Sequence, residues 1–229
     1  MPRHYLYKYY TERSWAEDFL DGKLLFRSLS YFRDYEDTEV REDQNEGTAL
    51  FRPQGGLVLN NQTQGNTVNL PNHTFKSSVK QEEIFIFCTS RFNSDEIQKR
   101  FEAVAYIEIM NIKAFCERIE KALPLGAKFP ERAGRSAQIG RHVEYYCESE
   151  GGNPRWALPE VIATSKLKSY AWQNEFRLVF SLTDALDFEN VSLSIVHESN
   201  AREVPKPSEH HHYLVESQPL RDICQLHEV

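Results

Sequence analysis

The sequence predicts an α+β fold with mostly antiparallel short strands and two or three helices. Short apolar and aromatic runs recur along the chain and are separated by Gly, Asn and Gln positions, a pattern typical of strands joined by turns. The segment 111–123 has helical periodicity, with its apolar residues on one side. No GxGxxG, P-loop, GxSxG or HExxH motif occurs, which disfavours Rossmann, phosphate-loop and α/β-hydrolase folds.

The first half of the chain opens on a Tyr-rich segment, 5–10, which is expected to form a strand. Ser14-Trp-Ala-Glu17 has the spacing of a capping box, so a short helix is expected to begin there and to end at Gly22. The other elements expected here are a strand at 24–26, a turn of helix within 27–37, and strands at 57–59, 74–79 and 83–90. The last of these strands is a continuous apolar run, which predicts burial on both faces.

The second half is expected to contain a strand at 102–109, a helix at 111–123, strands at 141–147, 168–180 and 191–195, and a short closing helix at 220–226. Pro124 and Gly126 end the helix at 111–123. The alternation of Val191, Leu193 and Ile195 predicts the late strand.

The length suits one large domain or two small ones, and no internal repeat is present; we interpret residues 1–229 as a single domain. Loops near 125–138 and 148–159 are expected to be mobile. A polar linker is expected at 205–212, which includes Glu209-His-His-His212. Consecutive histidines cannot all face one ion from a strand or helix, so no metal site is expected there.

Composition sets further limits. The net charge of −7 argues against a general nucleic-acid binder, since affinity for phosphates comes mainly from Lys and Arg. The four cysteines are far apart and form no CxxC pair, which indicates a reducing, cytoplasmic setting. The N-terminus is too polar and aromatic for a signal peptide. No apolar run approaches the roughly 18 residues that span a membrane, so no membrane partner is expected.

The segment Lys168-Ser-Tyr-Ala-Trp-Gln-Asn-Glu-Phe-Arg-Leu-Val-Phe180 carries the most informative pattern. Gln173, Glu175 and Arg177 fall at i, i+2 and i+4, so on a strand they point to one face while the apolar residues point to the other. Burying such polar groups is costly unless they are paired or used. The segment is therefore either an edge strand with a solvated polar face or a row of polar groups that lines a cleft.

Two regions together resemble a family of uncharacterised bacterial proteins. The early region is Tyr-Lys-Tyr-Tyr10, a short helix, and then Gly22-Lys-Leu-Leu-Phe-Arg-Ser-Leu-Ser-Tyr-Phe-Arg; the late one is Trp172-Gln-Asn-Glu-Phe-Arg. That family has a Gly, an aromatic strand and Ser-x-x-x-Phe early, and Trp-x-x-Glu-x-Arg late. Its usual Asn-Asp-Pro turn is replaced here by Arg-Asp-Tyr at 33–35. The family has no established function, so this resemblance implies no chemistry.

A second resemblance is to mono-ADP-ribosyltransferases of the Arg-Ser-Glu type. These have, in order, an Arg on an early strand, Ser-Thr-Ser at the end of a buried strand, and a late Gln/Glu-x-Glu. This chain has Arg27, Cys88-Thr-Ser90 and Gln173-Asn-Glu175 in that order, with Cys88 in place of the first Ser. The resemblance implies an ADP-ribosyltransferase-like split sheet, NAD as substrate, and a role as a bacterial toxin or in phage defence.

The same resemblance implies roles for individual residues. Glu175 holds the ribose 2′-OH and stabilises the oxocarbenium charge that builds as the nicotinamide bond breaks. Gln173 orients the acceptor; the sequence leaves protein, nucleic acid and small molecule open. The other implied contacts are Arg27 with the pyrophosphate through its planar donor fork, Thr89 and Ser90 as hydrogen bonds that hold the site together, and Tyr31 or Phe32 stacked on nicotinamide.

A different class of function is a non-catalytic ligand or nucleic-acid binding module, in which Gln173, Glu175 and Arg177 form a buried structural network. For a single-stranded nucleic acid, a local basic and aromatic surface is the candidate interface. Its residues are Arg132, Arg135, Arg141, Tyr145, Tyr146 and Trp156.

A third interpretation is a metal-dependent nuclease that uses the acidic loop 36–47. Asp37, Asp43 and Glu46 are the candidate Mg²⁺ ligands. The alternative for this loop is a solvated, charged surface.

Overall fold

The structure, a computed structural model, describes residues 4–34, 45–131, 137–150, 153–198 and 209–229. The fold is α+β, as predicted, and all but one of the strand pairs among these residues are antiparallel. The strands are β1 (Leu6–Tyr10), β2 (Lys23–Ser28), β3 (Thr48–Phe51), β4 (Leu57–Asn61), β5 (Asn66–Leu70), β6 (His73–Ser78), β7 (Ile84–Ser90), β8 (Ala105–Ile109), β9 (Gly140–His142), β10 (Glu144–Tyr146), β11 (Ser165–Leu167), β12 (Glu175–Ser181), β13 (Ser192–His197), β14 (His212–Glu216) and β15 (Cys224–Glu228). The α-helices are α1 (Arg13–Leu20), α2 (Leu29–Asp34), α3 (Asp95–Arg100), α4 (Ile112–Ala122) and α5 (Pro159–Ala163).

The largest sheet has eight strands and is built around β7. The apolar run of β7 sends β-branched and aromatic side chains to both faces, which suits a central strand. On one edge β12 pairs with β7 along its whole length, from Glu175 opposite Ser90 to Ser181 opposite Ile84. β9 pairs with the far edge of β12, so β12 lies inside the sheet.

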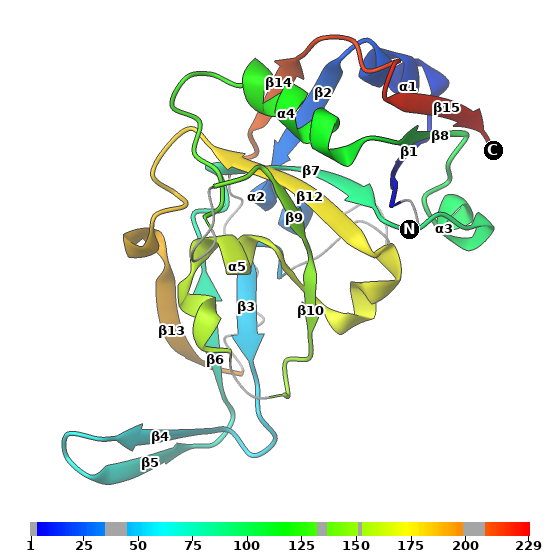
Figure 1. Cartoon of the computed structure of the whole chain (residues 1–229). Helices are drawn as coiled ribbons and strands as arrows, with labels where there is room; N and C mark the ends of the chain where they lie inside the picture. The colour runs from blue at the N-terminus through cyan, green and yellow to red at the C-terminus, as the bar shows by residue number, and fades with distance from the viewer. Residues whose placement is uncertain (1–3, 35–44, 132–136, 151–152, 199–208) are drawn as a thin grey trace.

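The other edge of β7 has two partners that diverge. β2 pairs with β7 at Phe85 and Ile86, whereas β1 pairs with it at Ser90. Among the described residues, 87–89 have no strand partner on this edge. β2 continues outward to β14, and β1 continues to β8 and β15. The sheet therefore splits into two wings beside β7 (Figure 1).

One face of the β7–β12 pair packs against α1 and α4 (Figure 1). Phe176, Leu178 and Phe180 lie on this face, as the alternation of the strand predicts. Phe19 of α1 and Phe115 of α4 complete it, and both are fully buried. Each of these large side chains stabilises the fold by about 1.5–3 kcal/mol through burial alone.

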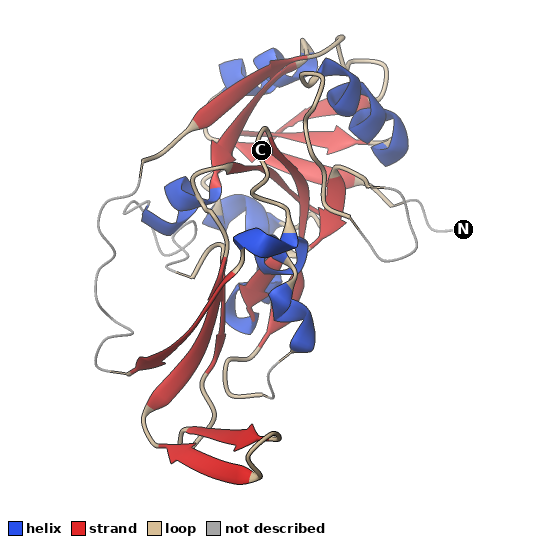
Figure 2. Cartoon of the chain, turned by 90° about the vertical axis from the view of Figure 1, so that its left-hand side faces the viewer, coloured by secondary structure: helices blue, strands red, loops and turns tan. Residues whose placement is uncertain are grey.

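The opposite face carries a second core. Ile84 and Ile86 of β7 and Val179 of β12 pack there with Leu29 of α2 and Ile162 of α5. This second core continues toward a smaller sheet of order β13–β6–β3. That sheet extends away from the large sheet and ends in the β4–β5 hairpin (Figure 2).

Most of the expected elements are present, but several expectations are wrong. The described residues form more helices than the two or three expected, and α3, β3 and β5 lie where no element was expected. The expectation of a closing helix at 220–226 is wrong, because this segment is a turn followed by β15. β15 adds to the edge of β8, and this long-range pairing overrides the local apolar spacing.

The start of the first helix and the strand expected at 141–147 also differ from the expectation. The helix near Ser14 begins at Arg13 with Glu12 as its N-cap, so the Ser14–Glu17 capping box does not form. The strand expected at 141–147 is divided into β9 and β10, which pair with different partners. Of the expected linker at 205–212, residues 205–208 lie outside the described residues, and His212 begins β14.

No helix in the described part of the chain is long and apolar enough to cross a membrane.

Gly22 provides a test of how α1 is joined to the sheet. Its φ is +93°, and a Cβ there would overlap the carbonyl oxygen of Ser217, which follows β14. Gly126 has a φ of +96° with open space around it. We expect Gly126→Ala to cost about 1–2 kcal/mol of unfolding free energy through backbone strain, and Gly22→Ala to cost roughly 1–3 kcal/mol more through the overlap. Urea denaturation of both variants measures the difference; equal losses would contradict the close approach.

Candidate functional site

A cavity of about 640 Å³ lies beside β7, where β1 and β2 separate. A volume of this size suits a small-molecule ligand. The cavity is lined by all of the site residues that the resemblance to ADP-ribosyltransferases implies, together with Arg177, although they come from distant parts of the chain. These residues are Arg27, Tyr31, Thr89, Ser90, Gln173, Glu175 and Arg177.

Glu175 and Arg177 reach the cavity from β12. All seven residues of this strand are buried, and it has a partner on each edge. The interpretation of this segment as an edge strand with a solvated polar face is therefore wrong. Gln173 is not on the strand, since it ends a 3₁₀ helix at Lys168–Gln173. Asn174, with a φ of +43°, turns the chain from this helix into β12.

Arg177 is fully buried, and all of its guanidinium donors are used. Nη1 and Nη2 donate to the two carboxylate oxygens of Glu46 at 2.6 and 2.8 Å. Nε donates to Glu175 Oε1 at 2.7 Å, and Nη2 lies 3.4 Å from Glu175 Oε2. Nη1 also donates to the carbonyl oxygen of Ala163 at 2.7 Å. These five contacts match the five N–H groups of an arginine, so the buried cation is satisfied.

Lys166, on β11, completes this buried network. Its Nζ donates to Gln173 Oε1 at 2.9 Å and to Glu175 Oε2 at 3.2 Å, and it lies 3.8 Å from Glu46 Oε2. Lys166 is only 7% exposed. Two carboxylates and two cations therefore share one buried cluster next to the cavity, and their formal charges cancel. Such a cluster is stable in a low-dielectric interior only when each charge is paired with an opposite charge and hydrogen-bonded, as here.

The charges in the cluster change the ionisation of its members. Burial alone raises the pKa of Glu175, but the charges of Arg177 and Lys166 outweigh it and hold that pKa well below the ordinary range. Burial raises the pKa of the nearby Cys88 thiol far above its usual value, so Cys88 stays protonated. Glu175 is thus a carboxylate at neutral pH, and Cys88 is not a thiolate nucleophile.

Ser90 and Thr89 fasten this part of the site to the backbone. Ser90 Oγ lies 2.8 Å from the carbonyl oxygen of Gln173, so β7 holds the end of the 3₁₀ helix in place. Thr89 Oγ1 donates to the carbonyl oxygen of Phe176 at 2.9 Å. Both hydroxyls therefore bind main-chain groups of the segment that carries Gln173 and Glu175.

Arg27 occupies another wall of the cavity. It lies on β2, and its guanidinium sits 4.5 Å from the ring centroid of Tyr31. No hydrogen bond or ion pair joins this guanidinium to the described residues. Lys23, a neighbour on the same face of β2, is instead paired with Asp18 at 2.9 Å. Arg27 is therefore a half-buried cation, oriented by a ring and able to donate to an anionic ligand.

Sequence reasoning missed several residues that line the cavity. The sequence marks Glu46 only as one acid of the 36–47 loop, and Lys166 belongs to a three-residue strand with no recognisable pattern. Lys8 lies in the gap between the wings, with Nζ 3.0 Å from the carbonyl oxygen of Cys88. Trp15 is half exposed at the cavity wall. The hydrophobic periodicity of β12 identifies neither Glu46 nor Lys166, since Glu46 is distant in sequence and Lys166 lies before the alternating residues, on a different strand.

The other candidate sites gain little from the structure. Glu46 is bound by Arg177 through both carboxylate oxygens, and Asp37 and Asp43 lie outside the described residues. No group of three or more His, Cys, Asp or Glu side chains with the geometry of a metal site occurs among the residues that the structure describes.

The described residues of the candidate basic and aromatic surface make contacts within the fold. Trp156 is buried and packs against Tyr146, and the hydroxyl of Tyr145 accepts a hydrogen bond from the backbone N–H of Glu175. Arg141 donates to the carbonyl oxygens of Gly140 and Pro130. Arg132 and Arg135 lie outside the described residues.

No family model, curated protein or solved structure matches this chain. The case for a function therefore depends on the geometry of the cavity and on general chemistry.

Arg177→Met tests the buried network. It leaves Glu46 and Glu175 without their main cation, so we expect a loss of about 3–5 kcal/mol in unfolding free energy at pH 7. Wild-type Glu175 has a lowered pKa when folded, so its contribution is present above its ordinary value of 4.5 and is lost as the pH falls below it. In the variant, protonation of Glu175 lowers the cost of burying this carboxylate without Arg177, so the difference in unfolding free energy from wild type should shrink on acidification.

Arg221→Met is the matched control, because Arg221 also binds two carboxylates, Glu17 and Asp21, but on the surface. We expect this variant to unfold close to wild type at every pH. Denaturant unfolding between pH 4 and 8 makes the comparison. An Arg177→Met variant as stable as Arg221→Met would show that the network is not stabilised by the buried guanidinium.

Proposed function

We propose that this protein is an ADP-ribosyltransferase-like enzyme that binds NAD in the cavity beside β7 and breaks the bond between nicotinamide and ribose. The observation that carries the proposal is the convergence of the three motifs. Arg27, Thr89–Ser90 and Gln173–Glu175 are far apart in sequence, yet all line one cavity at the split in the sheet. Chance matches to short motifs would scatter over the fold instead of meeting in one cavity.

Glu175 is suited to the chemistry of this proposal. As the C1′–N bond breaks, the electron pair leaves with nicotinamide and positive charge develops on the ribose. A carboxylate fixed beside that ribose stabilises the charge without reorganising. Glu175 is held ionised and rigid by Arg177 and Lys166. An acceptor oxygen or nitrogen then bonds to C1′ and releases its proton to solvent.

Arg27 supports the choice of an anionic nucleotide as ligand. The cations that line the cavity are Lys8, Lys23, Arg27, Lys166 and Arg177, against the carboxylates Asp18, Glu46 and Glu175. The chain as a whole carries a net charge of −7, so the excess of cations among the described lining residues is opposite in sign to the charge of the whole chain. A planar guanidinium on an aromatic ring matches a pyrophosphate.

A second candidate function is a non-catalytic module that binds a nucleotide-like ligand in the same cavity. The observation that favours it is the pairing of the buried network. Both oxygens of Glu175 already accept hydrogen bonds from Arg177 or Lys166, as expected of a structural ion cluster. In this case the cluster shapes the cavity wall and does not act on the ligand.

NAD consumption separates the two candidates. We expect the wild type to release nicotinamide, and Glu175→Gln to lower the turnover by about 100-fold or more, because the transition-state charge loses its carboxylate. Glu117→Gln, on the exposed side of α4, is the control and should match wild type. Chromatography of nicotinamide is the measurement, with circular dichroism to verify folding. A folded wild type that binds NAD without releasing nicotinamide would favour the binding module.

Arg27→Met tests ligand binding apart from catalysis. The loss of a charge-assisted contact with the pyrophosphate should weaken the affinity for NAD and for ADP-ribose by about 10- to 100-fold. Arg100→Met is the control, since Arg100 also lies over a ring, that of Trp172 at 4.6 Å, but does not line the cavity. Isothermal titration calorimetry gives both affinities. Unchanged binding by Arg27→Met would remove Arg27 from the anion site.

A further inference from the structure

We infer that Lys166 is a positioning residue that holds Gln173 and Glu175 in the orientation in which they meet the ligand. Its ammonium lies between the Gln173 amide oxygen at 2.9 Å and the Glu175 carboxylate at 3.2 Å. This role deepens the proposed function and rests on it. No motif points to Lys166, which lies seven residues before the first of its two partners.

The contact with Lys166 determines the orientation of the Gln173 side-chain amide, that is, the positions of its oxygen and its nitrogen. An ammonium group can only donate hydrogen bonds, so the atom that it contacts must be the amide oxygen. The other end of the amide is then its nitrogen, a donor. The Gln173 main chain is fixed as well, by Ser90 Oγ at 2.8 Å from its carbonyl oxygen. The Gln173 amide is thus held in one orientation at the cavity wall, with its oxygen toward Lys166.

Lys166 also restrains the Glu175 carboxylate. Arg177 holds Oε1 through Nε at 2.7 Å but approaches Oε2 only to 3.4 Å. The closer cation to Oε2 is Lys166, so Lys166 fixes the second oxygen. A shift of about 1 Å in a catalytic group can cost on the order of 100-fold in rate, so loss of this restraint should appear in turnover more than in ligand affinity.

A purely structural role and a positioning role of Lys166 predict different results for variants that restore the balance of buried charges. Lys166→Met leaves two buried carboxylates with one cation, so this variant is expected to be destabilised as well as slow. In the double variant Lys166→Met, Glu46→Gln, one carboxylate and one cation remain. The amide introduced at position 46 can still accept a hydrogen bond from Arg177 through its oxygen. The double variant restores the charge balance but not the contact with Gln173.

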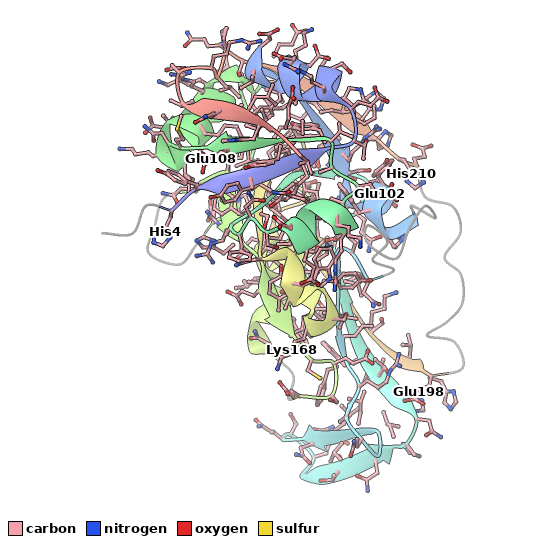
Figure 3. The ribbon with its side chains drawn as sticks, turned by 90° about the vertical axis from the view of Figure 1, so that its right-hand side faces the viewer. His4, Glu102, Glu108, Lys168, Glu198 and His210 are labelled. Carbon is pink, nitrogen blue, oxygen red and sulfur yellow. The ribbon has the colours of Figure 1, made fainter. Side chains whose placement is uncertain are left out.

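The experiment measures unfolding, NAD affinity and nicotinamide release for wild type, both of these variants, Lys166→Arg and Lys168→Met. Lys168 is the matched control because it is exposed and follows two residues later (Figure 3). We expect the double variant to recover stability yet to stay about 10- to 100-fold slower than wild type with a similar NAD affinity. Lys166→Arg should recover part of the rate, and Lys168→Met should match wild type. A double variant that recovers both stability and turnover would overturn the positioning role.

A readout on the free protein keeps this inference separate from the proposed function. The carboxamide signals of Gln173 in a ¹⁵N–¹H spectrum can be assigned by their absence from Gln173→Glu. We expect them to shift in the double variant and to stay unchanged in Lys168→Met. If the wild type does not turn over NAD, the proposed enzyme fails, while the shift still supports positioning by Lys166. Signals that match wild type in the double variant would refute positioning whether or not NAD is consumed.

Discussion

The guanidinium of Arg177 is the interaction on which the rest of the structure depends. It is fully buried and joins three separate parts of the chain: β12 itself, Glu46 just before β3, and the carbonyl of Ala163 at the end of α5. These parts belong to the large sheet, the smaller sheet and the helix between them. An unpaired guanidinium would cost far more than the fold could offset. The pairing of all five donors therefore ties the segment before β3 and the end of α5 to β12.

The split beside β7 follows from the same central strand. β7 gives its full length to β12 but divides its other edge between β1 and β2. A strand edge left open in this way has unpaired backbone groups, which proteins usually cover. Here the ammonium group of Lys8 reaches the carbonyl of Cys88 in the gap, and cavity-lining side chains surround the rest. The cavity is thus a consequence of strand topology, and its chemistry comes from the residues that border the gap.

The sequence was informative where a pattern is local. The alternation in β12 predicted which face Phe176 and Leu178 occupy, and the apolar run of β7 predicted a buried strand. The order of the Arg27, Thr89–Ser90 and Gln173–Glu175 motifs selected residues that line a common cavity. What the sequence could not predict is which side chains pair across the fold. Glu46 looks like one more acid in a charged loop, and only the distant Arg177 makes it a core residue.

The failed expectations have the same origin. Residues 220–226 have helix-like apolar spacing, yet the open edge of β8 recruits their second half as β15. Gln173 has strand-like spacing from Glu175, but Asn174 in the left-handed region ends a 3₁₀ helix there. In both cases a partner or a single backbone angle decided the outcome, and neither can be read from residue periodicity.

The β4–β5 hairpin has a consequence for how this fold can vary. Its strands pair with each other, and none of its residues line the cavity. Val58 and Val68 on it are largely exposed, so the hairpin adds little to either core. Changes in the length or sequence of the hairpin should thus leave the ligand cavity unaltered. The arm is a natural place to attach a fluorophore or an affinity handle without disturbing the split sheet.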